Sequence, residues 1–258
     1  MTGGVSESGG PGFHTTHWSV VLAAADRATP GSSEALETLC RSYWYPIYAF
    51  LRRDGHGVHQ AQDLTQEFLA RVVERNPFAG IQPSGKFRSF LLVTLKHFVS
   101  DQRKRDQALK RGSGQQLISI DAEEAEQRYR FEPVDPLTPE KLFERRWATT
   151  VLEQTLKRLQ HVHESKGLSE LFAALRPCLV GSSQRANYHQ IGLQLGQSET
   201  AIKGAVLRLR REFGELLRTE IAKTVSDPAE VEEEIRQLIT AGMAGGEFSD
   251  NLPTPNSL

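Results

Sequence analysis

Hydrophobic residues recur every three or four positions along most of the chain, which is the spacing of amphipathic helices. In the first half this spacing predicts three helices, over about 33–53, 59–75 and 86–110. Pro46 lies inside the first of them and should kink it, because proline has no amide proton to donate to the carbonyl of Ser42. Three helices with aromatic residues on their apolar faces are enough for one small domain.

The second half repeats the helical pattern and contains no strand-rich stretch. Predicted helices cover about 140–163, 169–179 and 188–195, and a longer one begins at 199. A short amphipathic helix with an acidic outer face follows residue 225. The fold class that this pattern predicts is all-α.

The stretch from Gly112 to Pro139 interrupts the periodicity. It contains turn residues, three prolines and an excess of acidic side chains, and nothing in it predicts a core. We therefore expect two small helical domains joined by a Pro-containing acidic linker, the second with a helix-turn-helix. The expected parts are a disordered N-terminus (1–17), a first domain (18–111), the linker (112–139), a second domain (140–225) and an acidic C-terminal extension (226–258).

The helix-turn-helix prediction depends on the residues around 188–213. Gly196 should stop the short helix, and Ser198 stands where an N-cap is expected before the long one. The hydrophobic residues of the long helix fall on one face, and Arg208 and Arg211 fall on the opposite face. A short helix, a glycine turn and a longer helix with a basic outer face are typical of a DNA-binding helix-turn-helix.

Composition excludes several classes of protein. Of the 258 residues, 38% are hydrophobic and 24% are charged, which is not the balance of a collagen-like, wholly disordered or membrane protein. The N-terminus has no secretory signal pattern, and Cys40 and Cys178 form no CxxC motif. These features favour a reducing compartment, the cytoplasm.

The net charge of −1 conceals a strongly uneven distribution. Residues 86–111 contain eight Lys or Arg and two Asp, for a net charge of +6, and residues 201–223 contain six Lys or Arg and three Glu, for +3. Residues 224–258 contain seven Asp or Glu and one Arg, for −6. The two basic blocks indicate a polyanionic partner such as nucleic acid.

Three segments carry a family resemblance. They are DLTQEFLARVVER (63–75), KFRSFLLVTLKHFVSDQRKR (86–105) and YHQIGLQLGQSETAIKGAVLRLRREF (188–213), in this order around the acidic linker. In these segments the chain resembles the bacterial RNA polymerase sigma factors of the extracytoplasmic-function (ECF) type. The resemblance covers about residues 18–225 and implies a sigma factor that binds core RNA polymerase and directs promoter-specific transcription initiation.

The resemblance also implies which residues act. It assigns polymerase binding to the first segment, the −10 promoter element to the second and the −35 element to the third. The polymerase-binding candidates are Asp63, Leu64, Gln66, Glu67, Phe68 and Arg71. The −10 candidates are Lys86, Arg88, Lys96, His97, Ser100, Arg103, Lys104 and Arg105. The −35 candidates are Ser198, Glu199, Thr200, Lys203, Gly204, Leu207, Arg208 and Arg211.

The chain departs from the family pattern at a few positions. His97 and Phe90 stand where Asn and Trp are common, and Gly204-Ala205 stands where Ser-Arg is common. These departures leave the promoter sequence open. The aromatic residues of the second segment fall on its apolar face, which favours core packing over stacking on bases.

Other interpretations stay open. The alternative function is a polymerase-independent, dimeric helix-turn-helix transcriptional regulator, and a third is a protein that binds polymerase and not DNA. The acidic extension either covers a basic surface and masks DNA binding or is a solvated helix without a regulatory role. Implied partners are core RNA polymerase and promoter DNA, and control by an anti-sigma factor is left open.

The sequence offers little for an enzyme. It contains no P-loop, no GxGxxG and no GxSxG motif. Histidine pairs occur at 14/17, 56/59 and 161/163, but none lies in an HExxH motif or near a cysteine. We expect no metal, no cofactor and no catalytic activity.

Overall fold

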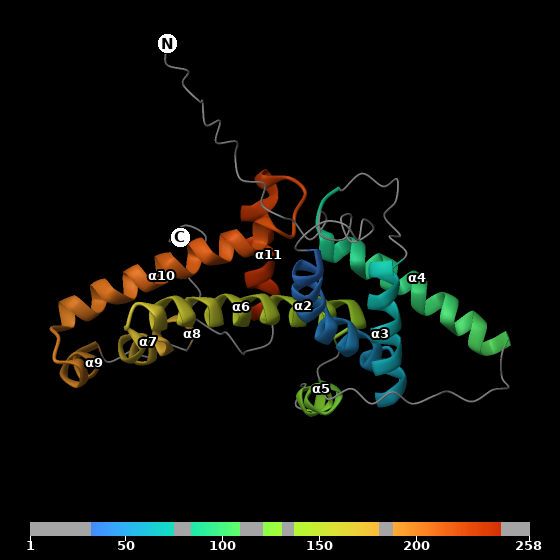
Figure 1. Cartoon of the computed structure of the whole chain (residues 1–258), viewed down its shortest axis with the longest axis horizontal. Helices are drawn as coiled ribbons and strands as arrows, with labels where there is room; N and C mark the ends of the chain where they lie inside the picture. Colours follow the sequence, from blue (N-terminus) through green and yellow to red (C-terminus); the bar gives the residue numbers. More distant parts are fainter. Residues whose placement is uncertain (1–31, 75–83, 109–120, 131–136, 181–187, 244–258) are drawn as a thin grey trace, which may run out of the picture.

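The structure, a computed structural model, describes residues 32–74, 84–108, 121–130, 137–180 and 188–243 (Figure 1). The elements in these ranges are α2 (Ser32–Arg53), α3 (Val58–Glu74), α4 (Phe87–Ala108), α5 (Asp121–Arg130), α6 (Pro139–Ser165), α7 (Ser169–Leu175), α8 (Pro177–Val180), α9 (Tyr188–Leu195), α10 (Glu199–Ala222), the 3₁₀ turn η1 (Pro228–Glu230) and α11 (Val231–Met243). Within the described residues the only β-type pairing is an isolated antiparallel bridge between Lys86 and Val225. The all-α prediction is confirmed.

Helix α6 is the central element of the fold. Its N-cap Thr138 accepts a hydrogen bond from the backbone amide of Lys141 at 3.3 Å, and Pro139 occupies the first turn, where its missing amide proton costs nothing. The 27 residues of α6 span about 40 Å at the usual helical rise. Figure 1 shows α2 crossing one end of α6, α10 running along the other end and α11 crossing between them.

The hydrophobic core follows α6 through the molecule. Buried side chains of α2, α3 and α4 form one continuous cluster with those of α6, α10 and α11. The largest of them is Trp147, near the start of α6, with 1% of its surface exposed. The second predicted domain therefore shares a core with the first through α6, and the division into two domains stays a prediction.

The interpretation of 112–139 as a linker without a core is wrong for α5. Glu126 of α5 is buried against α2, where its carboxylate accepts hydrogen bonds from Tyr48 Oη at 2.6 Å and from Arg52 Nε at 3.0 Å. Burial would raise the pKa of Glu126, but the bonds from Arg52 and Tyr48 outweigh it and the pKa lies below its ordinary value. Tyr129 adds an edge-on ring contact with Tyr48, with 6.5 Å between the ring centroids. A polar helix is thus held against α2 by a buried ionic contact and an aromatic one.

Elsewhere the predicted helices agree closely with the structure. Helix α2 continues through Pro46 to Arg53, and Gly55 follows with a φ of +97°, in the left-handed region that glycine adopts freely. The short helix expected after residue 225 is α11, preceded by a turn in which Asp227 accepts from the amide of Ala229 at 2.9 Å. This helix packs against α6 and α10.

Candidate nucleic-acid interfaces

The turn between α9 and α10 is tight. Gly196 has a φ of +64°, and the side chain of Ser198 accepts a hydrogen bond from the amide of Ala201 at 3.2 Å, which caps α10. Gly192 approaches the turn so closely that a Cβ on it would lie 2.6 Å from the carbonyl oxygen of Gln197. Glycine at 192 and 196 therefore sets how closely α9 approaches the start of α10.

Helix α10 presents one apolar and one polar face. The buried residues of its first half include Ile202, Val206 and Leu209, and Phe213 continues the same row. The eight residues predicted to read the −35 element lie on the N-cap and the outer face, where all except the half-buried Gly204 are exposed. The structure therefore brings this whole predicted set together on one open surface.

The side chains on this open surface are held loosely. Lys203 pairs with Glu199 at 2.7 Å, which keeps the pKa of the exposed Glu199 carboxyl below its ordinary value. Arg211 Nε lies 3.9 Å from Glu215, and Arg208 has no hydrogen-bond or ion-pair partner among the described residues. Leu207 is 66% exposed between them. Basic groups flanking an exposed apolar side chain match the phosphates and thymine methyl groups of a DNA major groove.

The start of α4 differs from its sequence-based interpretation. Arg88 was expected to face DNA, yet only 5% of its surface is exposed. Its guanidinium donates to both carboxylate oxygens of Glu234, at 2.5 and 3.1 Å, and to Glu144 at 2.9 Å, and it lies 4.9 Å from the centroid of the Trp147 ring. Burial would lower the pKa of Arg88, but the two carboxylates outweigh it and raise the pKa above its ordinary value. Arg88 therefore lies inside the protein.

Lys86, just before α4, is half-buried and pairs with Glu234 at 2.8 Å. The other members of the predicted −10 set follow the exposed side of α4, where three cations have acidic neighbours: Lys96 with Glu140 at 2.8 Å, Arg103 with Asp54 at 2.6 Å and Lys104 with Asp101 at 3.5 Å. His97, Ser100 and Arg105 are exposed, as is the apolar Val93. Phe87 and Phe98 are buried and Phe90 is half-buried, which confirms core packing for the first two.

The predicted polymerase-binding set on α3 is divided by burial. Asp63 is exposed and Gln66 half-buried, but Leu64 and Phe68 are 8% and 1% exposed and face the core, where Phe68 contacts Phe98. The structure therefore places these two away from any partner surface. Glu67 is bonded to Arg71 and accepts from Gln102 at 2.7 Å, so both residues of this pair have internal partners.

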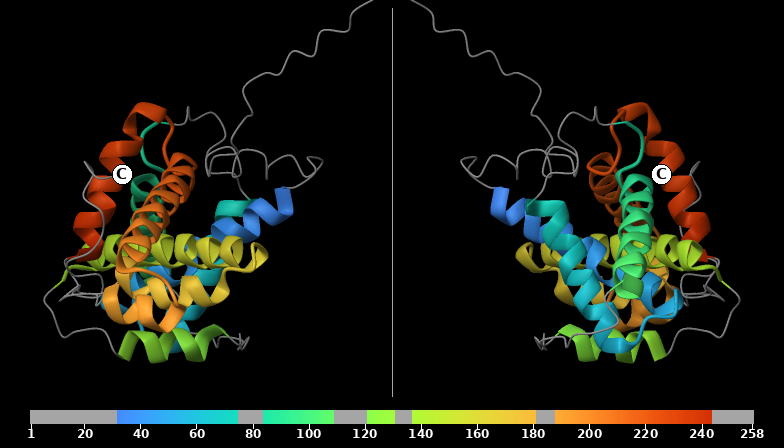
Figure 2. Two further views of the ribbon diagram at one scale, coloured as in Figure 1. Left: turned by 90° about the vertical axis from the view of Figure 1, so that its left-hand side faces the viewer. Right: turned by 90° about the vertical axis from the view of Figure 1, so that its right-hand side faces the viewer.

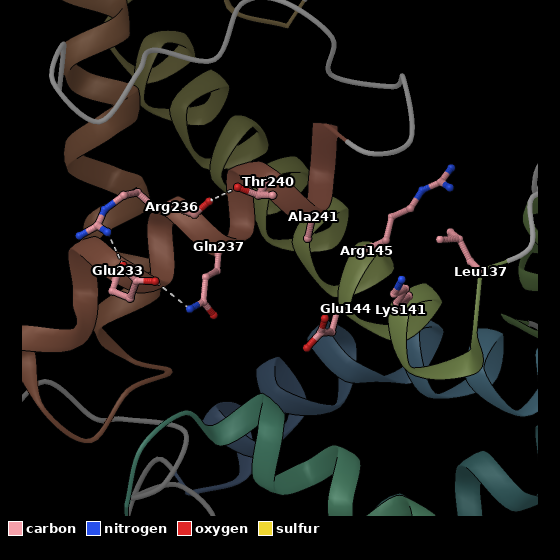
Figure 3. Close-up of a pocket in the computed structure, with 9 residues that line it drawn as sticks. All are labelled: Leu137, Lys141, Glu144, Arg145, Glu233, Arg236, Gln237, Thr240 and Ala241. Atoms are coloured by element: carbon pink, nitrogen blue, oxygen red, sulfur yellow. Dashed lines mark hydrogen bonds and ion pairs between the residues drawn. The ribbon is translucent and has the colours of Figure 1, made fainter.

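A cavity of about 560 Å³ separates α11 from the start of α6 (Figure 3). Its acidic side chains are already engaged, because Glu144 binds Arg88 and Glu233 binds Arg236 and Gln237. Sequence reasoning missed the two residues beside this cavity that bind the start of α4, Glu234 and Gln237. The signal was present: Glu234 shares a helical face with Val231, Ile235 and Leu238, the apolar residues of this short amphipathic helix.

Within the described residues, no three His, Cys, Asp or Glu side chains are grouped as metal ligands would be. His56 lies 3.3 Å from Asp54, and His163 Nε2 lies 2.9 Å from Glu212. His14 and His17 lie outside the described residues. The described helices include none with the length and apolar character needed to cross a bilayer.

Comparison with known proteins identifies no relative. No family model matches the sequence, and neither a curated protein nor a solved structure matches it. Any assignment of function therefore depends on the residues and geometry of this chain.

Proposed function

We propose that this protein is a promoter-specificity subunit of bacterial RNA polymerase, a sigma factor that binds the core enzyme and recognises −10 and −35 promoter elements. The observation that carries the proposal is the tight α9–α10 turn followed by an open basic face on α10. The resemblance of three segments to ECF sigma factors, in the order that family requires, supports it.

In this proposal α10 enters the major groove of the −35 element. The exposed N-terminal residues Thr200 and Lys203 reach base edges, because the first turns of a recognition helix lie deepest in the groove. Arg208 and Arg211, further along the same face, bind phosphates and set the register of the helix. Leu207 supplies an apolar contact between the two groups.

Helix α4 contacts the −10 strand along its exposed side. His97 and Ser100 offer hydrogen-bonding groups, and Arg105 continues the basic surface toward the end of the helix. On α3, Asp63 and Gln66 are the members of the predicted polymerase-binding set that are neither buried nor paired with another side chain among the described residues. Polymerase binding through α3 leaves α4 and α10 for DNA.

Co-purification with core RNA polymerase at moderate salt tests this proposal. The full chain is compared with Asp63→Ala/Gln66→Ala and with the control Glu170→Ala, which changes an exposed acidic residue of α7. We expect stoichiometric binding by the wild type and the control, and at least tenfold less by the double variant. Binding of duplex DNA without any association with polymerase would contradict the proposal and favour the dimeric regulator.

A further inference from the structure

The carboxylate of Glu234 lies in a corner formed by two cations at the start of α4. Its oxygens accept from Arg88 Nε at 2.5 Å and Nη2 at 3.1 Å, and one of them lies 2.8 Å from Lys86 Nζ. Gln237, one helical turn further on, accepts from Arg88 at 2.9 Å and from Lys86. Glu234 has no exposed surface, so its carboxylate is enclosed in this corner.

The geometry of the corner is that of an oxyanion site. A guanidinium that donates two nitrogens to two oxygens of one group, with an ammonium beside it, is the arrangement with which proteins bind carboxylate and phosphate alike. Lys86 and Arg88 supply these donors, and both belong to the set predicted to contact promoter DNA. An acidic side chain of the same chain therefore occupies a site suited to a DNA phosphate.

The chain holds α11 against this corner with backbone contacts. The amide of Phe87 donates to the carbonyl of Thr224 at 2.9 Å, the amide of Ser226 donates to Gly85 at 3.2 Å, and Lys86 pairs with Val225 as an antiparallel bridge. Figure 2 shows the segment before α4 beside the connection from α10 to α11 in both views. The connection that leads into α11 is thus fixed against residues 85–87, which include one cation of the basic corner.

We propose that the Lys86–Arg88 corner is a binding site for a nucleic-acid phosphate, and that Glu234 of α11 competes with DNA for it. This inference rests on the proposed function. A phosphate enters only when Glu234 leaves, while Glu144 remains beside Arg88. The free protein therefore binds DNA weakly, and the acidic extension limits DNA binding until α11 is displaced.

Two variants of equal charge test the competition. Glu234→Gln removes the negative charge from the corner, whereas Glu232→Gln removes one from the same helix at a surface pair with Arg218. The probe is a fluorescein-labelled forked duplex, and its affinity for each full-length chain is measured by anisotropy over a range of salt concentrations. We expect Glu234→Gln to bind at least tenfold more tightly than the wild type and Glu232→Gln within twofold of it. A folded Glu234→Gln with wild-type affinity would overturn the competition.

Hydrogen exchange of the wild type provides a second test that needs no variant. At low salt and saturating DNA, we expect the amides of α11 to lose protection while those of α6 keep it. Unchanged protection of α11 in the DNA complex would overturn the competition even if Glu234→Gln failed to fold.

Polymerase co-purification of the same chains separates the two proposals. If the competition alone is wrong, polymerase binds normally while Glu234→Gln and wild type bind DNA equally. If the sigma-factor proposal alone is wrong, Glu234→Gln still gains DNA affinity but no chain retains polymerase.

Discussion

The two predicted DNA-binding regions differ in what their arginines contact. Arg88, at the start of α4, is buried between Glu234 and Glu144, which lie 146 and 56 positions away along the chain. Arg208, on α10, is exposed and has no ionic partner among the described residues. Both belong to basic blocks that look alike in sequence.

This contrast shows that the charge of the local sequence does not decide whether a basic residue is buried in an ion pair or exposed on the surface. A buried guanidinium requires carboxylates that compensate for the lost water, and those carboxylates come from distant segments. An exposed guanidinium keeps its water and gains little from a neighbouring acid. The first kind contributes to the fold and can meet a partner only after a carboxylate leaves, whereas the second is exposed to a partner as it stands.

The largest expected effect comes from removing each arginine. Arg88→Met leaves Glu234 buried with only Lys86 as its cation, which we expect to lower the free energy of unfolding by about 3 kcal/mol. Arg208→Met, at an exposed position, should change it by less than about 0.5 kcal/mol. Urea unfolding followed by circular dichroism measures both. Equal losses in the two variants would refute the contrast between the two regions.

The next effect concerns the tight turn between α9 and α10, which positions the exposed basic face of α10. Gly192→Ala places a Cβ 2.6 Å from the backbone oxygen of Gln197, and relieving this clash should lower the free energy of unfolding by about 2 kcal/mol. The control Gly204→Ala, in α10, meets only Arg208 at 3.6 Å. It should stabilise the protein by about 0.5 kcal/mol, because alanine favours helix. Thermal unfolding shows whether each variant loses or gains stability. A Gly192→Ala variant as stable as the wild type would contradict the close approach of α9 to the turn.

Charge reversal on the open face should weaken DNA binding by at least tenfold, or about 1.4 kcal/mol. The variant is Arg208→Glu/Arg211→Glu, and the control is Lys157→Glu/Lys166→Glu, which makes the same charge change at exposed positions of α6 and its end. Loss of phosphate contacts should also flatten the salt dependence of binding. Anisotropy titrations against duplex DNA measure both quantities, and equal losses in the two double variants would show that only net charge matters.

Much of this architecture is predictable because helical periodicity is local. The spacing of apolar residues predicted the helices, and Gly196 with Ser198 predicted the α9–α10 turn. Helix α5 was missed because its ten residues are mostly polar and its buried Glu126 is satisfied by Tyr48 and Arg52 of another helix. Long-range ionic partners leave no periodic signal.

The candidate site was predictable to a smaller extent. Predicting the −35 set required only knowing which face of one helix is polar, and the structure places the set together on α10 and its N-cap. The −10 and polymerase-binding sets included Arg88, Leu64 and Phe68, whose burial depends on how α4 and α3 pack. Glu234 stands in an acidic run that resembles a solvated face, and only its register with Ile235 and Leu238 indicates burial.

The smallest expected effect compares a buried and an exposed carboxylate by how each changes stability at acid pH. The pKa values of Glu126 and Glu199 both lie below their ordinary values, but Glu126 is buried with Arg52 and Tyr48, whereas Glu199 is exposed beside Lys203. A carboxyl whose pKa is lower in the folded protein adds stability above its unfolded pKa of about 4.3 and loses it as the pH falls through the folded value. Glu126→Gln should therefore cost about 1 kcal/mol at pH 7 and nothing once the pH is below both pKa values.

The control for this last effect is Glu199→Gln. Its ion pair lies in water, where screening leaves little net stability, so its unfolding curve should follow the wild type at every pH. Urea unfolding between pH 3 and pH 7 measures the convergence of Glu126→Gln with the wild type. If Glu199→Gln reduced the pH dependence of the free energy of unfolding below pH 7 as much as Glu126→Gln does, the pairing of exposed charges on α10 would matter to the fold. The distinction between buried ion pairs, which support the fold, and exposed ion pairs, which do not, would then fail.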